Sequence, residues 1–224
     1  MTGTIRIALG CGLLVSTSAF GLASTKTRYA ESFFPEGNIE RVVIAADIGD
    51  VVIVPGEEVR VERHVKGLKN AIDVSHVVTD GTLTVAAVCT TILPCRVDTK
   101  LTVPVGMGVH VDVGAGEIMA NSIGPLTAEL GAGLVEADVI GNLRVQLGTG
   151  SVHASVVDAE SVKIGLGDGD VEVTLPSENW AMDISATRLN LQGIESTEAG
   201  SNRLAIMAPA GTVLVRGQVP VAQR

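Results

Sequence analysis

The sequence VHVDVGAGEIMA, at residues 109–120, recurs three more times in altered form. The further copies are LTAELGAGLVEA at 126–137, LRVQLGTGSVHA at 143–154 and VKIGLGDGDVEV at 162–173. Each copy contains a Gly-x-Gly corner, and the first glycines of successive corners are 17, 17 and 19 residues apart. A period near 20 residues predicts a fold in which one structural unit is stacked on the next.

Apolar residues occupy alternate positions on both sides of each corner. The positions just before it are Val113, Leu130, Leu147 and Leu166, and those two beyond it are Ile118, Val135, Val152 and Val171. This period of two predicts strands with one buried face, whereas an amphipathic helix would repeat at i, i+3 and i+4. Glycine permits the backbone conformation that a tight corner needs. We therefore expect an all-β fold in which strands stack turn upon turn.

Three weaker copies extend the pattern. They surround Asp47-Ile48-Gly49, Ser185-Ala186-Thr187 and Pro209-Ala210-Gly211, which makes seven candidate turns in all. Weakened copies are typical of the ends of repeat folds. The sequence thus predicts one β-solenoid domain at residues 41–217, followed by a loose tail at 218–224.

Residues 58–100 interrupt the repeat and predict antiparallel structure at the N-terminal end of the stack. Val59 to Val65 alternates apolar and charged residues, which predicts an exposed strand. Two further apolar runs flank Thr79-Asp80-Gly81, a hairpin signal. Residues 24–40 are expected to be a lead-in segment in which Phe33-Phe34 covers the open end of the stack.

Residues 1–23 have the features of a secretory signal peptide. Arg6 precedes the largely apolar run Ile7 to Ala23, and the small residues at its end predict cleavage before Ser24. Two alternatives stay open, namely an uncleaved membrane anchor and lipidation at Cys11, which lies in a faint lipoprotein-like sequence. We expect a secreted or cell-envelope protein.

The net charge of the 224-residue chain is −9, and it becomes −10 if the leader with Arg6 is removed. An acidic surface argues against nucleic acid and anionic membranes as partners. A membrane partner is expected only if the N-terminal segment is retained or lipidated. Aromatic residues make up only 2% of the chain, so the core must be aliphatic.

Cleavage would leave two cysteines, Cys89 and Cys95. An even pair in an exported protein predicts a disulfide, which here closes a small loop. Free buried thiols and a metal site are the alternatives. The metal site is the weaker one, because two cysteines without nearby histidines do not complete a zinc site.

The sequence holds no motif of an enzyme or of a resident cofactor. It has no Gly-x-Ser-x-Gly elbow, no His-Glu-x-x-His and no phosphate-binding loop. The Gly-x-Gly pairs are not a dinucleotide fingerprint, because they recur every turn and no helix follows them. We therefore expect a protein without catalytic residues or a cofactor.

Stacking would align polar residues of successive turns on the outer face. Glu136, His153 and Glu172 share one such column, which could bind a divalent cation or raise the proton affinity of the histidine. The alternative is a solvated ladder of charges. Asp112 and Glu129 would also be neighbours, but nothing apolar nearby would raise one pKa as a hydrolase pair requires.

The repeated corners, the approach Lys100-Leu101-Thr102-Val103-Pro104-Val105-Gly106 and the early Asp47-Ile48-Gly49-Asp50-Val51 together resemble a known family. It is the bacterial "putative adhesin" family, a domain of unknown function, and the resemblance covers roughly residues 40–216. The resemblance implies a right-handed parallel β-helix and an exported or envelope location. The family offers no catalytic residues to transfer.

Three functions are consistent with these features. The first is a monomeric, non-enzymatic surface protein that binds an envelope or extracellular ligand, protein or polysaccharide, or acts as a spacer. The second is a structural solenoid that self-assembles end to end. The third, a carbohydrate-active enzyme, is disfavoured because Trp180 alone could stack on a sugar, and its position in the alternation points inward.

Overall fold

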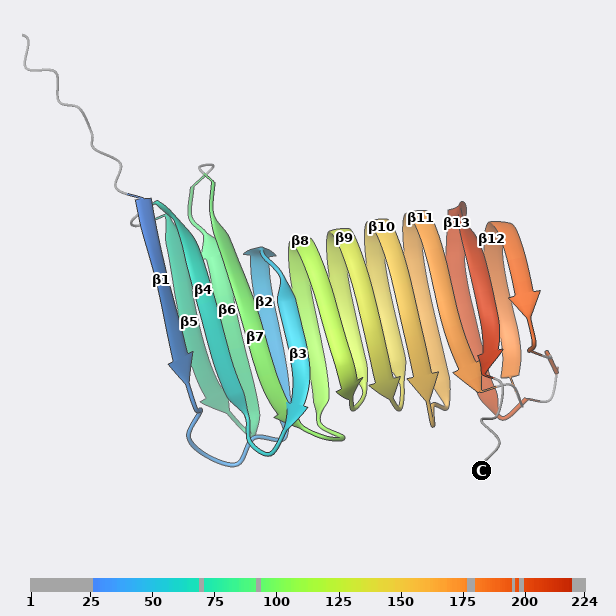
Figure 1. Cartoon of the computed structure of the whole chain (residues 1–224), viewed down its shortest axis with the longest axis horizontal. Helices are drawn as coiled ribbons and strands as arrows, with labels where there is room; N and C mark the ends of the chain where they lie inside the picture. Colours follow the sequence, from blue (N-terminus) through green and yellow to red (C-terminus); the bar gives the residue numbers. More distant parts are fainter. Residues whose placement is uncertain are drawn as a thin grey trace, which may run out of the picture.

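The computed structural model describes residues 26–68, 71–91, 94–176, 180–194, 196–197 and 200–218. The expected leader at 1–23 and all but the first residue of the expected tail lie outside these ranges. Within them the chain is all-β and forms one sheet of thirteen strands, most of them parallel (Figure 1). No helix long and apolar enough to cross a membrane occurs in this described part of the chain.

The strands of the N-terminal half are short and those of the C-terminal half are long. Their bounds are β1 Lys26–Phe33, β2 Arg41–Ile48, β3 Val51–Gly56, β4 Arg60–Leu68, β5 Ile72–Thr79, β6 Thr82–Cys89, β7 Arg96–Pro104, β8 Gly108–Ile123, β9 Leu126–Ile140, β10 Leu143–Val157, β11 Ser161–Pro176, β12 Trp180–Gln192 and β13 Asn202–Gln218.

The four clear copies of the repeat are strands β8 to β11, which pair in parallel. Leu130, Leu147 and Leu166 lie opposite one another on successive strands, as the alternation predicts. All three are at most 4% exposed. Like positions of the repeat therefore form columns, and the apolar columns make up the core.

Each long strand must bend, because its end lies close to its own beginning. The backbone N–H of Val109, at the start of β8, donates to the carbonyl of Pro125, just beyond its end (3.0 Å). In the same way, the backbone N–H of Leu126, at the start of β9, donates to the carbonyl of Asn142, just beyond the end of this strand of 15 residues. A straight strand of that length would span roughly 50 Å. The bend falls at the Gly-x-Gly corner, and Figure 1 shows these strands as curved ribbons stacked side by side.

The corner glycines allow the backbones of successive turns to approach closely. Gly150 has a φ of 136°, in the region that favours glycine. A Cβ atom built there would overlap the carbonyl oxygen of Gly133, and a Cβ on Gly133 would overlap that of Gly116. Glycine is therefore required at the second position of the corner for two reasons. The backbone has a positive φ there, and the carbonyl oxygen of the preceding turn leaves no room for a Cβ atom.

Strands β2 and β3 carry the first weak copy and pair in parallel with the two halves of β8. On their other side, β6 pairs with β2 and β7 pairs with β3. Antiparallel partners then complete the N-terminal end: β5 beside β6, β4 beside β7 and β1 beside β4. The hairpin at Thr79-Asp80-Gly81 is confirmed, since Thr79 pairs with Thr82 and both turn residues have positive φ.

The prediction of an exposed strand at Val59 to Val65 is wrong. Strand β4 lies between β1 and β7, and its residues Val61 and Val65 are at most 1% exposed. The charged residue between them, Arg63, is 2% exposed and also points into the core. The sequence suggested an exposed strand because this inward position carries an arginine.

Arg63 is accommodated at the N-terminal end by a set of polar and aromatic contacts. It forms an ion pair with Glu31 of β1, and its Nη1 donates to the carbonyl of Ser75 on β5 (3.0 Å). Its guanidinium lies 5.3 Å from the ring centre of Phe33, which stacks on His76 at 4.0 Å. These contacts join β1 to β5 across the end of the stack. The expected cover is thus provided by Phe33, while Phe34 is 59% exposed.

The two C-terminal copies do not stack in chain order. Strand β13 pairs in parallel with both β11 and β12, so it lies between them and β12 forms the edge (Figure 1). Trp180 opens β12 and points inward as predicted, with 0% exposure and its indole N–H donating to the carbonyl of Pro176 (2.9 Å).

Replacing the second corner glycine should destabilise the fold. We expect Gly150→Ala to lower the free energy of unfolding by about 3 kcal/mol, because the added methyl group is both strained and overlapped by a carbonyl oxygen. Denaturant unfolding followed by circular dichroism measures this change. The matched control is Thr149→Ala at the exposed centre of the same corner, which should stay within about 0.5 kcal/mol. Equal effects of the two changes would contradict this explanation.

Candidate binding groove and polar clusters

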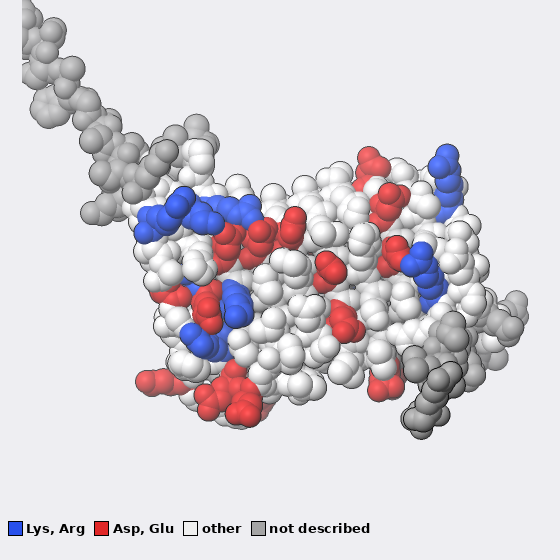
Figure 2. Space-filling view, in the orientation of Figure 1, with Lys and Arg blue, Asp and Glu red and all other residues white. Residues whose placement is uncertain are grey.

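Three cations form a row across the outer face of the N-terminal strands. Arg28 on β1 lies opposite Lys66 on β4, and Lys66 lies opposite Arg96 on β7. Figure 2 shows Lys and Arg side chains gathered as a band at this end, with acidic side chains beside them. Like charges directly opposite each other on neighbouring strands are unfavourable unless they are compensated.

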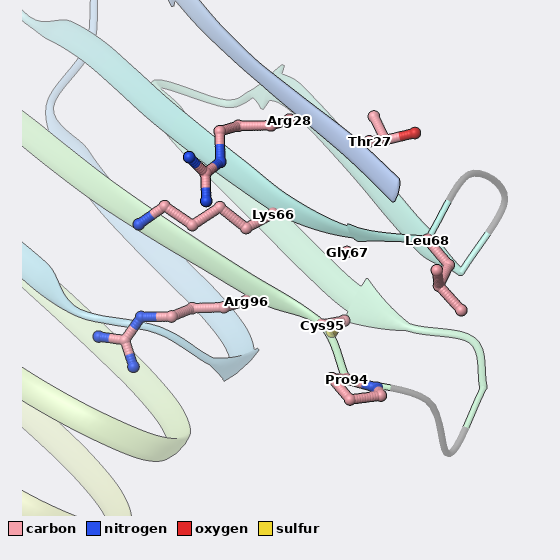
Figure 3. Close-up of a pocket in the computed structure, with 8 residues that line it drawn as sticks. All are labelled: Thr27, Arg28, Lys66, Gly67, Leu68, Pro94, Cys95 and Arg96. Carbon is pink, nitrogen blue, oxygen red and sulfur yellow. The ribbon is translucent and has the colours of Figure 1, made fainter. Parts of the chain in front are cut away.

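A groove runs beside this row and has a volume of about 480 Å³ (Figure 3). Arg28, Lys66 and Arg96 border it, and their side chains extend away from Leu68, Pro94 and Cys95. Its other lining residues are Thr27, Gly67, Leu68, Pro94 and Cys95. The lining of the groove is therefore largely apolar, and no aromatic ring is part of it.

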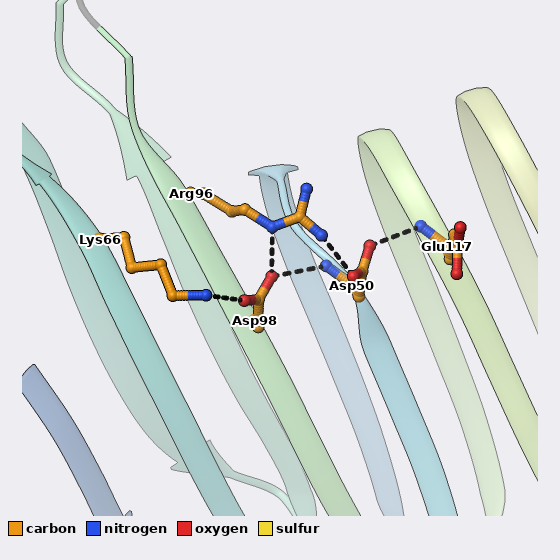
Figure 4. A network of polar contacts seen from close by, with 5 residues as sticks. All are labelled: Asp50, Lys66, Arg96, Asp98 and Glu117. Atoms are coloured by element: carbon orange, nitrogen blue, oxygen red, sulfur yellow. Dashed lines mark hydrogen bonds and ion pairs between the residues drawn. The ribbon is translucent and has the colours of Figure 1, made fainter. Parts of the chain in front are cut away.

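Carboxylates compensate two of the three cations (Figure 4). Asp98 accepts hydrogen bonds from Lys66 Nζ (2.9 Å) and from Arg96 Nε (2.6 Å). Arg96 also forms an ion pair with Asp50. The carboxylate of Asp50 in turn accepts from the backbone N–H of Glu117 (3.1 Å), while its own N–H donates to Asp98 (3.2 Å). The network ties the first corner to β7 on one side and to β8 on the other.

The network shifts two pKa values in opposite directions. Burial lowers the pKa of Arg96, but hydrogen bonds to Asp50 and Asp98 outweigh it, and the net shift is upward. Burial raises the pKa of Asp98, but hydrogen bonds from Lys66, the Asp50 backbone and Arg96 outweigh it, and the net shift is downward. Both groups are therefore held in their charged forms.

Arg28 differs from its two neighbours in the row. Among the described residues it has no hydrogen bond or ion pair, and its side chain is exposed. Its guanidinium is therefore in contact with solvent.

The predicted disulfide between Cys89 and Cys95 is present, with a Cα–Cα distance of 6.1 Å. It joins the end of β6 to the residue before β7. The backbone N–H of Cys89 also donates to Asp47 (2.6 Å), near the first corner. The alternatives of free thiols and of a metal held by these cysteines are therefore wrong for this structure.

The predicted column of Glu136, His153 and Glu172 is aligned by the pairing of β9, β10 and β11. These side chains line a shallow pocket of about 250 Å³. Glu172, however, forms an ion pair with Arg216 of β13. No group of three His, Cys, Asp or Glu side chains suited to a metal ion occurs in the described part of the chain. The cation site at this column therefore stays a prediction, and so does the alternative of a solvated ladder of charges.

Asp112 and Glu129 lie opposite each other on β8 and β9, as predicted. Both are exposed on the outer face of the sheet. Their neighbours in the same row are Ala45 on β2 and Gln146 on β10. This arrangement gives neither carboxylate an apolar enclosure.

No protein-family model and no curated protein matches the chain. Among solved structures, one described as a putative cell adhesion protein from Clostridium sporogenes has a TM-score of 0.51 and 14% identity. The match covers 86% of this chain and 100% of that one. Another, described as a putative adhesin from Bacteroides fragilis, has a TM-score of 0.41 and 12% identity, over 86% and 98% of the two chains. The first likeness shows a shared fold, and its description agrees with the family resemblance of the sequence.

Asp98 should make stability depend on pH at the acid end. Its lowered pKa means that its contribution is complete above the unfolded value of about 3.9 and is lost as the pH falls through the lower folded value. We expect Asp98→Asn to lower the melting temperature at neutral pH by about 2–4 °C. The variant should also lose less stability than the wild type on acidification below about pH 4.

Melting curves recorded across this pH range check the expectation. Asp112→Asn is the matched control, because this aspartate is exposed and forms none of these contacts. If the two variants showed the same pH dependence, the network would not account for the acid sensitivity.

Proposed function

We propose that the chain is an exported, non-enzymatic surface protein that acts as an adhesin-like binding or spacer scaffold. The observation that carries this proposal is the fold shared with the solved protein described as a putative cell adhesion protein, which is matched over its whole length. The disulfide supports it, because such bonds persist in secreted and periplasmic compartments. The ligand is expected to be an envelope or extracellular protein or polysaccharide.

The architecture proposed for this scaffold is a right-handed parallel β-helix of about seven turns. The short returns between successive long strands support it, since each strand ends beside its own start. The β2–β3 pair and the strands β8 to β13 would supply the seven turns. Such a fold offers long, flat outer faces, which suit extended ligands.

The absence of catalysis is part of the proposal. Trp180, the single tryptophan, is fully buried and hydrogen-bonded, so it cannot stack on a sugar. The exposed pair of Asp112 and Glu129 lacks an apolar enclosure. Turnover of a polysaccharide, lost on changing either carboxylate, would contradict this part of the proposal.

Localisation and binding can be tested together. We expect the protein to be recovered from the envelope or medium with Ser24 at its N-terminus, as shown by fractionation and mass spectrometry. Labelled protein should bind saturably to isolated envelope or surface fractions, and heat-unfolded protein should not. Protease or periodate treatment of the fractions then distinguishes a protein ligand from a polysaccharide. Recovery of the intact chain from the cytosol with its leader retained would overturn the proposal.

One observation favours self-assembly as a second candidate. On the edge strand β12, Leu189 and Leu191 are 48% and 43% exposed. Their parallel partners on β13, Val213 and Val215, are fully buried. An unpaired edge with half-exposed apolar side chains can pair with another chain.

Light scattering over a range of concentrations separates this candidate from the monomeric scaffold. Self-assembly predicts a mass above 23.0 kDa that rises with concentration. The rise should disappear in Leu191→Lys but persist in Met207→Lys, which alters an exposed apolar residue on the outer face of β13. A mass that stays at the monomer value would rule the candidate out.

A further inference from the structure

We propose that two copies of the chain associate through the second half of β12. Residues 188–192, the edge segment, would pair antiparallel with the same residues of the second copy. The dimer rests on the self-assembly candidate described above and specifies its geometry. A two-fold contact of this kind uses the same surface of both copies, so the assembly stops at two chains and does not grow into a fibre.

The two halves of β12 differ in how much of their outer edge is free. At the start of the strand, Trp180 forms a parallel bridge with Ser196, and its carbonyl accepts from the backbone N–H of Thr197 (3.0 Å). Because β13 lies on the other side of β12, this contact covers the beginning of the free edge. Within the described part of the chain, the edge segment pairs with β13 alone. One row of its backbone groups is therefore left for a further strand.

The edge segment is apolar as well as unpaired. Leu189 and Leu191 lie opposite Val213 and Val215 of β13, which are fully buried. The two leucines thus continue an inward column of the core, yet each is more than 40% exposed. A further strand beside β12 would remove this apolar surface from water, which favours association.

The two other edge strands of the described chain carry protection that the edge segment lacks. On β1, Glu31 lies opposite Arg63 and forms an ion pair with this buried side chain. On β5, His76 lies opposite the buried Val85 and stacks on Phe33. Inward-pointing charged or polar residues discourage the addition of a strand. The inward positions of the edge segment hold only leucines, so pairing is expected there and not at the N-terminal end.

The edge segment reads Arg-Leu-Asn-Leu-Gln and is complementary to itself when two strands run in opposite directions. Pairing centred on Asn190 places Leu189 of each copy opposite Leu191 of the other. It also places Arg188 opposite Gln192, so no two like charges meet. The chain has a net charge of −9, but the one charge within the edge segment is that of its arginine. A second copy therefore matches both the apolar and the polar positions of this edge.

Light scattering over a dilution series tests the proposal on the protein as isolated from its producing cells. We expect the mass to rise with concentration and to level off at twice its value at high dilution. Asn190→Asp and Asn190→Lys each place like charges opposite each other across the two-fold axis. Each variant alone should raise the dissociation constant of the dimer about fivefold. An equimolar mixture of the two should regain at least the wild-type affinity, because opposite charges then meet.

Ser185→Asp and Ser185→Lys are the matched controls, because Ser185 is exposed on the first half of the same strand and lies outside the edge segment. These variants, alone or mixed, should leave the dissociation constant unchanged. Equal effects at the two positions, or no recovery on mixing the Asn190 variants, would overturn the two-fold pairing. So would a mass that keeps rising beyond two copies.

A wild type that stays monomeric up to roughly millimolar concentration overturns the proposal. If removal of residues 219–224 then produces a dimer, the end of the chain itself occupies the edge. If the amides of Leu189 and Leu191 resist hydrogen exchange only when envelope fractions are added, a strand of another protein occupies it. Binding to those fractions is measured separately, so a monomer that still binds them overturns the dimer and leaves the adhesin-like scaffold intact.

Discussion

The fold depends on the close approach of one corner's carbonyl oxygen to the corner glycine of the next turn. At Gly116, Gly133, Gly150 and Gly169 a single added carbon would meet the carbonyl of the preceding turn. Because this contact recurs at these four corners, it fixes their turns in register with one another. The apolar columns, the shared bends and the alignment of outer-face residues all follow from that register. A corner without glycine could form only where a neighbour is absent or displaced, and this is where the repeat weakens.

Much of this arrangement could be predicted from the sequence, because it depends on a repeated local pattern. The period and the parity of the repeat were enough to predict the inward alternation and the corners. They were also enough to predict the alignment of Glu136 with His153 and Glu172. The order of the last two turns could not be predicted, since the copies at Trp180 and Leu204 have similar alternation. Nothing in the sequence of either copy indicates which of the two strands pairs with β11. The ion pair between Glu172 and Arg216 was missed for the same reason, because it requires β13 to lie beside β11.

The irregular N-terminal end was harder to predict because its contacts are long-range and antiparallel. Arg28, Lys66 and Arg96 are separated by 38 and 30 residues, and only the pairing of β1, β4 and β7 makes them a row. Arg63 was assigned to an exposed strand because a charged residue at an inward position usually excludes burial. Its burial depends on Glu31, Phe33 and Ser75, which lie on two other strands. The cysteine pair was the exception, since an even pair in a chain expected to be exported predicts a disulfide.

The contrast between the two parts of the molecule bears on where recognition takes place. In a regular stack every turn presents the same positions, so a ligand held by one column could slide to the next with little loss of binding. A unique site requires a break in the repeat, and residues 58–100 provide one. They separate the first two turns along the chain, and their strands β6 and β7 pair with the side of β2 and β3 that faces away from β8. That insertion contributes Lys66, Arg96 and Asp98, which complete the cationic row with Arg28 and the polar network with Asp50. We therefore expect the regular turns to act as a support and specific binding to occur where the repeat is interrupted.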